Sequence, residues 1–347
     1  MSKVLILRVC NKDRASFDGF QWPESGPVEC PPPDPKKPGS HWDPKPVFGN
    51  GLHGWLWGEG DGYLGTVFPD SRWLVVEVLE SDIVYLDGCV KFPKGEVVFC
   101  GSRSKAADYL ASYDNIYKVI IGRTLAVGDG ESAHVGDYGY AMAGDSGVAL
   151  SGVLGTSVAG NYGLAVTGDQ GSAKAGFLSR ATAGFRGQAY VDGQGVAVTG
   201  THGKAHAGDS GHATAGDEGS AICGAHGIAK AGEQGKATAG TSGLAEAGYR
   251  GTAIVEDRGI AIVGAGGLAQ AGNWGVAQAG VGGRLRITIW RSQGFYVLNG
   301  IVGTPEGLLP DTPYEIREGQ FRALDPSEFQ KRIQNHIQSV EKACRMS

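Results

Sequence analysis

The residues best suited to chemistry in this sequence gather around His53, in the stretch GLHGWLWGEGDGYLG (51–65). Glu59 and Asp61 follow it closely, and a histidine beside a carboxylate can act as an acid–base pair. The stretch also fits a structural interpretation, in which His53 packs in a turn lined by tryptophans. Its GEGDG segment lacks the Lys-Ser/Thr of a phosphate-binding loop. His53 is therefore one catalytic candidate, and Arg8, on the first predicted strand, is the other.

The remaining histidines and the cysteines do not form a metal site. His202, His206, His212 and His226 occupy repeat positions whose residue type varies freely, so surface variation explains them better than coordination does. The six cysteines contain no C-x-x-C pair and are scattered along the chain, as free thiols in a reducing compartment would be. Neither a metal nor a cofactor is predicted.

Residues 1–122 are predicted to form an α+β domain that positions His53 and Arg8. The runs 4–9, 73–79, 83–86 and 97–100 are rich in β-branched and other apolar residues and predict strands. The stretch 104–112 predicts a short helix with Ser104 as its N-cap. The proline-rich stretch 30–46 predicts a loop.

Residues 123–287 contain a repeat of eight residues, G-x-x-G-x-A-x-A, which runs for twenty consecutive octads from Gly128. Position one is glycine in all but two octads, where Asp192 and Glu256 replace it. Positions four and six are glycine and alanine in all but two octads each. A disordered glycine-rich linker would not hold this register, so stacking of the units must enforce it.

Each octad is predicted to supply one strand and one turn. Positions five to eight alternate between variable and small residues, which is the periodicity of a strand. Charged residues such as Lys174 and Glu246 occupy the variable positions and must face water, so the alanines face inward. The glycine at position one is expected to take a positive φ in the turn. Two octads then make one coil of sixteen residues. The predicted fold is mostly β: a flat two-sheet β-solenoid, with the N-terminal α+β domain before it and a C-terminal cap plus helix after it.

Odd and even octads differ at the outward position five, as two different faces should. Seven of ten residues there are aliphatic in the odd octads, against one of ten in the even octads. A long apolar row on a surface must be covered. The predicted interface consists of Val148, Leu150, Leu164, Val166, Val196, Val198, Ile228, Leu244, Ile260, Ile262 and Val276. A second copy of the chain is the expected partner, in a homodimer. The alternatives are the N-terminal domain or C-terminal helix of the same chain, or an unidentified protein.

Residues 288–347 break the repeat and are predicted to form a cap followed by an amphipathic helix. Asp325 is a suitable N-cap, and Pro326 suits the first helical position. The apolar stripe of this helix comprises Phe329, Ile333, Ile337, Val340 and Cys344.

Charge and targeting signals predict the location. The formal net charge of −5 is too small to indicate binding to nucleic acid or to a membrane surface. The first residues lack the features of a signal peptide, and no apolar stretch approaches the ~20 residues that span a bilayer. We therefore expect a cytoplasmic protein with no membrane partner.

The repeat, as in GDSGHATA (208–215) and GEQGKATA (232–239), resembles the octapeptide repeats of bacterial ice nucleation proteins. The stretch that follows it, 282–319, is similar in style to the C-terminal cap of those proteins. The resemblance implies β-solenoid coils of sixteen residues and suggests ice binding. The ice-organising faces of that family carry outward Thr-x-Thr rows, whereas no octad here has threonine at both outward positions.

Two further resemblances concern the N-terminal domain. FDGFQWP (17–23), GLHGW (51–55) and SRWLVVEV (71–78) resemble bacterial and phage proteins that join a small domain to Gly/Ala repeats, which implies no activity. The stretches 7–20 and 97–113 resemble ADP-ribosyltransferase-type domains, in which an arginine precedes a serine-rich strand and then a glutamate. Arg8 and Ser102 or Ser104 match the first two, but no Glu-x-Glu or Gln-x-Glu follows. The leading hypothesis is a non-enzymatic scaffold that self-associates and presents its N-terminal domain to a partner. The alternatives are an ADP-ribosyltransferase-like enzyme and an ice-binding protein.

Overall fold

The structure is a computed structural model that describes residues 2–16, 19–33, 41–113, 118–291, 294–305 and 307–345. The chain forms two compact units. One comprises Met1–Ala126, His134–Ala141 and Ser151–Gly155, and the other comprises Val127–Ala133, Met142–Leu150 and Thr156–Ser347. We call them the N-terminal unit and the solenoid unit. Part of the predicted proline-rich loop, residues 34–40, lies outside the described residues.

The N-terminal unit is built on a seven-stranded antiparallel sheet in the order β2-β7-β4-β1-β3-β6-β5. Its strands are β1 (Lys3–Cys10), β2 (Gly26–Glu29), β3 (Leu52–Leu56), β4 (Arg72–Leu79), β5 (Val84–Tyr85), β6 (Val90–Phe92) and β7 (Lys94–Gly101). The four predicted strands match β1, β4, β5 and β7. Two short 3-10 helices, Gly62–Leu64 and Glu80–Asp82, join strands. Helix α1 (Arg103–Ala111) follows β7, and its N-cap is Ser102 rather than the predicted Ser104.

The two faces of this sheet bury separate clusters, because successive side chains of a strand point to opposite sides. Leu5 and Leu7 of β1 pack in one cluster, together with Leu110 of α1. Ile6 of β1 packs in the other cluster, with Trp22 and other residues. The central strand β1 therefore carries apolar residues almost continuously, and this is the strand that holds Arg8.

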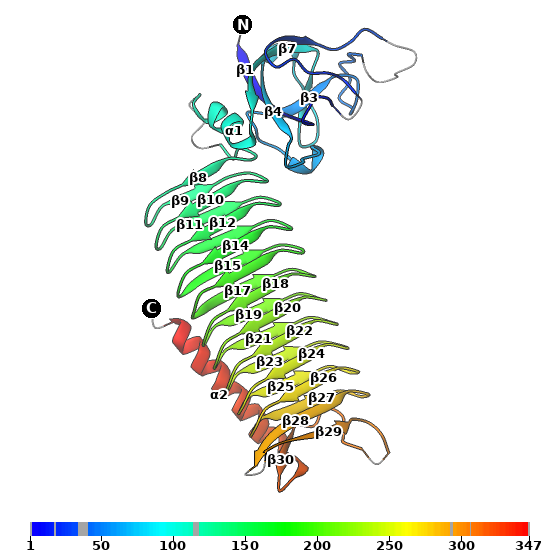
Figure 1. Ribbon diagram of the computed structural model, residues 1–347, viewed down its shortest axis with the longest axis vertical. Helices are drawn as coiled ribbons and strands as arrows, with labels where there is room; N and C mark the ends of the chain where they lie inside the picture. The colour runs from blue at the N-terminus through cyan, green and yellow to red at the C-terminus, as the bar shows by residue number, and fades with distance from the viewer. Residues whose placement is uncertain are drawn as a thin grey trace. The chain divides into compact units, whose positions relative to one another are not determined.

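The octads form the two sheets that the sequence predicted, with strands of odd and even octads on opposite sides (Figure 1). The even sheet contains β8 (Thr124–Ala126), β10 (Tyr140–Ala143), β12 (Thr156–Ala159), β14 (Ser172–Ala175), β16 (Gln188–Val191), β18 (Lys204–Ala207), β20 (Ser220–Cys223), β22 (Lys236–Ala239), β24 (Thr252–Val255), β26 (Leu268–Ala271), β28 (Arg284–Arg291) and β29 (Gly294–Ile301). The odd sheet contains β9 (Ser132–His134), β11 (Val148–Ser151), β13 (Leu164–Thr167), β15 (Ser179–Ala183), β17 (Gly195–Thr199), β19 (His212–Ala215), β21 (Ile228–Ala231), β23 (Leu244–Ala247), β25 (Ile260–Val263), β27 (Val276–Ala279), β30 (Tyr314–Arg317) and β31 (Gln320–Ala323).

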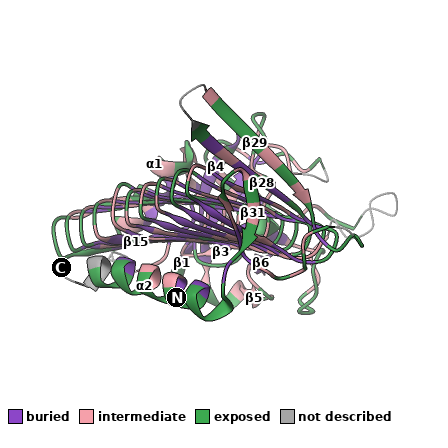
Figure 2. Cartoon of the chain, turned by 90° about the horizontal axis from the view of Figure 1, so that it is seen from below, coloured by how far each residue is buried: buried purple, intermediate pink, exposed green. Residues whose placement is uncertain are grey.

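Each coil pairs in parallel with the coil sixteen residues later. Ser172 pairs with Gln188 in the even sheet, and Leu244 pairs with Ile260 in the odd sheet. The alanines at position six are buried, and Ala213 and Ala221 are 0% exposed. Figure 2 shows the buried residues of the solenoid strands in purple. The predicted β-solenoid of sixteen-residue coils with an alanine interior is therefore confirmed.

The turns differ from the prediction in which residue takes a positive φ. That residue is the third of the octad and is usually not glycine, as at Ser210 (φ 55°) and Gln234 (φ 54°). Glycine at position one is required for a different reason, which is the close approach of the turn in the preceding coil. A Cβ on Gly232 would lie 2.7 Å from the Asp217 backbone nitrogen. The first glycine of the octad is therefore selected by stacking rather than by φ.

Carboxylates at position two join successive turns. Asp217 Oδ1 accepts a hydrogen bond from the Glu233 backbone nitrogen at 2.8 Å, sixteen residues later. Asp209 makes the same bond to Ala225 at 2.7 Å. Each such side chain satisfies a backbone donor that has no partner in its own coil, so the turns stack as a hydrogen-bonded column.

The C-terminal part closes the sheets and then returns along the solenoid as helix α2 (Pro326–Arg345) (Figure 1). The hairpins β28–β29 and β30–β31 end the even and odd sheets. Asp325 caps the helix as predicted, since its Oδ1 accepts hydrogen bonds from the backbone nitrogens of Ser327 at 2.9 Å and Glu328 at 3.2 Å.

Candidate functional site

The outward residues of the odd sheet form the predicted apolar row. Positions five and seven of each odd octad point away from the alanine interior, so Leu164 and Val166 of β13 lie outside while Ala165 between them is buried. The row divides into two parts with different surroundings.

Helix α2 of the same chain covers the C-terminal part of the row. Ile228 and Leu244 are 0% exposed, Val276 is 2% exposed, and they pack in one cluster with Phe329 of α2. The other cluster members are Ile260, Leu324, Ile333 and Val340, with Ile262 and Ile337 packed against them. The side chain of Cys344, which was expected on the same stripe, lies outside the described residues.

Among the described side chains, the cluster that α2 forms with the row includes none of its N-terminal part. This N-terminal part consists of Val148, Leu150, Leu164, Val166, Val196 and Val198, which we call the open stripe; all six side chains are partly exposed. Exposed Arg180 and partly exposed Thr182, on β15, separate β13 from β17 within it.

The structure therefore corrects the extent of the predicted interface. Ile228, Leu244, Ile260, Ile262 and Val276 belong to an intramolecular contact with α2, whereas the residues of the open stripe are not members of that cluster. The physical reason is the amphipathic face of α2, which supplies a matching apolar surface on the same chain. The alternative stated in the sequence analysis, that the C-terminal helix of the same chain covers the row, therefore holds for this part of it.

Two histidines lie where α2 meets the odd sheet. Burial lowers the pKa of His212, and the charge of Lys230 lowers it further, against smaller opposing effects of Glu341 and Glu246. Burial also lowers the pKa of His336, although the Gly227 carbonyl oxygen, 3.4 Å from its Nε2, partly opposes that shift. Both rings therefore favour the neutral form in the folded protein.

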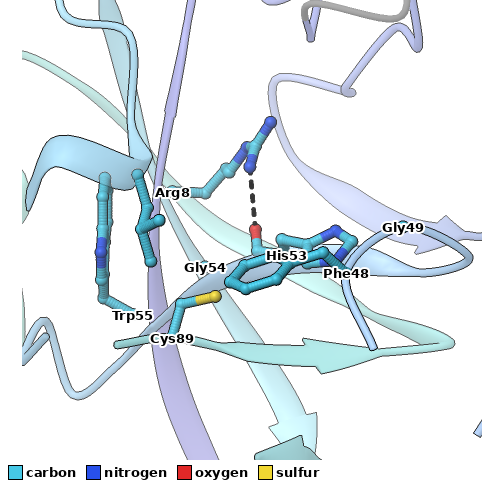
Figure 3. A pocket seen from close by; sticks show the side chains of 8 residues that line it. Arg8, Phe48, Gly49, His53, Gly54, Trp55 and Cys89 are labelled. Atoms are coloured by element: carbon cyan, nitrogen blue, oxygen red, sulfur yellow. Dashed lines mark hydrogen bonds between the residues drawn. The ribbon is translucent and has the colours of Figure 1, made fainter. Parts of the chain in front are cut away.

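The structure brings the two catalytic candidates together in the N-terminal unit. Arg8 of β1 and His53 of β3 line a cavity of about 230 Å³, and Arg8 Nη1 donates a hydrogen bond to the His53 carbonyl oxygen at 3.2 Å (Figure 3). His53 lies in a strand rather than in the turn that the structural interpretation suggested.

The carboxylates proposed as partners of His53 lie elsewhere. Glu59 Oε1 accepts a hydrogen bond from the Val119 backbone nitrogen at 3.1 Å, and Asp61 Oδ1 accepts one from Tyr63 at 2.9 Å. Neither of them lines the cavity. The geometry therefore provides no acid–base pair at His53 with these two residues.

Sequence reasoning missed most of the cavity wall. Phe48, Trp55, Leu64 and Cys89 line it with Gly49 and Gly54. Trp55 and Leu64 lie in the stretch 51–65 that the sequence singled out, whereas Phe48 and Cys89 lie outside it and no local motif marked them. Burial raises the pKa of the Cys89 thiol despite the opposing influence of the Arg8 charge, so this thiol favours its protonated form.

The described cysteines are free thiols. Burial raises the pKa of Cys10 and Cys30 to about 11 and that of Cys223 to about 12, which suppresses the thiolate that a nucleophile would need. Within the described part of the chain, no three His, Cys, Asp or Glu side chains gather into a set that could hold a metal. No helix there is both long and apolar enough to cross a membrane.

The repeat region is similar to bacterial ice nucleation proteins. The chain is 39% identical over 119 residues to an ice nucleation protein of Xanthomonas campestris pv. translucens, covering 34% of this chain and 7% of that protein. It is 38% identical over 118 residues to one of Pseudomonas fluorescens, covering 33% and 9%. A Pseudomonas syringae protein is 38% identical over 114 residues, covering 32% and 9%. The chain thus spans a tenth or less of the length of these relatives. No family model and no solved structure matches it.

The chain carries an ice-nucleation-like repeat. This similarity contradicts the predicted cytoplasmic location, because ice nucleation proteins are surface proteins anchored to the bacterial outer membrane. The prediction was wrong because it relied on the lack of recognisable targeting signals, which is not a positive signal for any compartment. Together, the ice-nucleation-like repeat and the β-solenoid fold fit a structural repeat scaffold.

Proposed function

We propose that the solenoid is a rigid scaffold that self-associates through the open stripe and presents the N-terminal unit to a partner. The observation that carries this proposal is the division of one apolar row into a buried part and an uncovered part. Where α2 covers the row, Ile228 and Leu244 are 0% exposed, whereas the six residues of the open stripe remain partly exposed. Apolar rows of this kind on a soluble surface usually mark an interaction site.

A second copy of the chain fits the open stripe because the stripe is flat and periodic. Parallel coils place its side chains at a regular spacing of about 4.8 Å, so a second stripe can pack against it over several coils. The stripe also continues the surface on which α2 already packs, which supports its capacity to bury aliphatic groups. Arg180 constrains the pairing, since two such charges placed opposite each other would repel.

The test is the molar mass in solution measured by light scattering on the full chain. We expect the wild-type protein to exceed the monomer mass of 36.0 kDa, and the double variant Leu164→Lys/Val196→Lys to be monomeric. The matched control is Ser172→Lys/Gln188→Lys, which adds the same charges at position five on the even face and should leave the assembly intact. A monomeric wild-type protein, or an assembly that survives the first double variant, would refute self-association through this stripe.

Ice binding is a second candidate, favoured by the similarity to ice nucleation proteins. The outward residues of the even face do not present a threonine row, since Thr156 is followed by Val158 and Thr252 by Ile254. Thermal hysteresis and droplet-freezing temperatures of the full chain would test this function. Ice binding would be ruled out if droplets containing the protein froze at the same temperature as droplets of buffer alone and showed no thermal hysteresis.

A further inference from the structure

Two cavities of the N-terminal unit meet at one arginine. The first, of about 230 Å³, contains the aromatic wall with Phe48 and Trp55. The second, of about 390 Å³, contains polar residues such as Ser16 and Asn11. Arg8 and Leu64 line both cavities, and neither set of lining residues includes an aspartate or a glutamate. Arg8 is thus the one permanently charged side chain among these described lining residues.

The hydrogen bonds of Arg8 leave part of its guanidinium unsatisfied. Nη1 donates to the His53 carbonyl oxygen at 3.2 Å, and Nη2 donates to Ser16 Oγ at 3.1 Å. Nε is buried and has no hydrogen-bond partner among the described residues, and no carboxylate of those residues forms an ion pair with Arg8. Nε itself is buried, but Nη1 and Nη2 each carry a second N–H, so an anion in the cavity would give the guanidinium further acceptors.

A second donor lies beside the guanidinium. Ser16 Oγ accepts hydrogen bonds from Arg8 Nη2 at 3.1 Å and from Trp22 Nε1 at 2.7 Å. These two bonds use the lone pairs of the oxygen, so its hydroxyl proton remains able to donate. Arg8 and Ser16 together can therefore hold two oxygen atoms of one anionic group.

The aromatic wall is held in place by a buried lysine. The Phe48 and His53 rings stack with 6.3 Å between their centroids and 11° between their planes (Figure 3). Lys91 of β6 is 0% exposed, and its ammonium donates to the carbonyl oxygens of Val47 at 2.9 Å and Gly49 at 3.3 Å. The segment that carries Phe48 is thereby fixed on both sides, as a preformed binding site requires.

We propose that the two cavities that share Arg8, which we call the Arg8 cavity, together bind a small organic anion that carries one aromatic ring. The anionic group lies against Arg8 and Ser16, on the side of the second cavity, and the ring lies in the first cavity against Phe48, His53 and Trp55. The volume of about 230 Å³ is below the range of about 300–1,000 Å³ that is typical of sites for drug-sized ligands, so it suits a single ring. Aromatic carboxylates and phosphate esters of single-ring alcohols or phenols share this chemistry.

The experiment is isothermal titration calorimetry of the full chain with benzoate and with phenyl phosphate. Binding of benzoate alone identifies the carboxylate class, and binding of phenyl phosphate identifies the phosphate-ester class; either supports the proposal. Acetate and inorganic phosphate, which lack the ring, and benzyl alcohol, which lacks the charge, should each bind about tenfold more weakly or not at all. Equal binding of these three, or no binding of the two probes, would overturn the proposal.

Three variants assign the binding to this cavity. Arg8→Met should weaken the probe by about tenfold or more, since a charge-assisted hydrogen bond contributes about 1.5–3 kcal/mol. Phe48→Ala, at a side chain that is 56% exposed, should weaken binding without unfolding the sheet. Arg72→Met is the matched control, because Arg72 is exposed on β4 and lines neither cavity. Unchanged affinity in both of the first two variants would also overturn the proposal.

Discussion

Opposite effects are expected at two residues of one turn, Gly232 and Gln234. Gly232 has no Cβ, and a Cβ there would lie 2.7 Å from the backbone nitrogen and 2.9 Å from the Cα of Asp217 in the preceding coil. It would also displace the Asp217 carboxylate, which accepts a hydrogen bond from the Glu233 backbone nitrogen at 2.8 Å. Gln234 is a non-glycine residue with φ of 54°, so glycine should be preferred there instead.

The magnitudes follow from these contacts. Overpacking costs about 1–3 kcal/mol, and the loss of a hydrogen bond to a charged group costs about 1.5–3 kcal/mol. The lower entropy of alanine in the unfolded chain offsets about 0.4–1 kcal/mol. Gly232→Ala should therefore lower the free energy of unfolding by about 1.5–5.5 kcal/mol. Gln234→Gly removes a left-handed strain of about 1–2 kcal/mol against a glycine cost of about 0.5–1 kcal/mol, and so should stabilise by up to about 1.5 kcal/mol.

The assay is urea unfolding followed by circular dichroism. Gly128 provides the matched control, since it has the same position in the first octad but a Cβ there meets only the Glu131 carboxyl group, at 3.5 Å or more. Gly128→Ala should be neutral or slightly stabilising. If Gly232→Ala were as stable as Gly128→Ala, the close stacking of the turns would be refuted, and a destabilised Gln234→Gly would refute the assignment of strain to position three.

Three further predictions concern buried groups of the solenoid unit. Phe329→Ala should destabilise α2 by about 3–5 kcal/mol, because Phe329 is 3% exposed. The hydrogen-exchange rates of the α2 amides measure this loss, and the exposed control Lys331→Ala should change those rates little. Thr167→Val should raise the free energy of unfolding by about 1 kcal/mol in urea titrations, since Thr167 Oγ1 is buried without a hydrogen-bond partner among the described residues. A lower free energy of unfolding in this variant would instead show that the Thr167 hydroxyl stabilises the fold. Burial lowers the pKa of His212 and His336 from 6.5, so the unfolded chain takes up protons first as the pH falls. Their contribution should be constant above about pH 6.5 and be lost as the pH falls toward the lowered folded pKa values. The double variant His212→Asn/His336→Asn should show a smaller loss of stability on acidification, and an identical pH dependence would contradict this reasoning.

The architecture of the solenoid could be predicted because it is encoded locally and repeated. The alternation of variable residues with alanine determines which side of each strand faces inward, and the difference between odd and even octads indicates two sheets. The role of glycine at position one was misjudged, because that residue responds to an atom in the preceding coil rather than to its own φ. Only coordinates show how closely Asp217 approaches Gly232.

The sequence by itself determined the strand periodicity, the coil length, the apolar row on the odd face and the amphipathic character of α2. The sequence also offered α2 as one possible cover for that row, but only the tertiary structure decided between the alternatives and showed that α2 packs against Ile228 to Val276 and not, among the described side chains, against the open stripe. It also decided that Arg8, Ser16, Phe48 and His53 line two cavities that share Arg8. The physical reason lies in the sequence separation of the contacts. Contacts between neighbouring coils join residues that are always sixteen positions apart, so the repeat itself indicates them. The other contacts join segments of unrelated sequence, and these meet only as a result of the path of the whole chain.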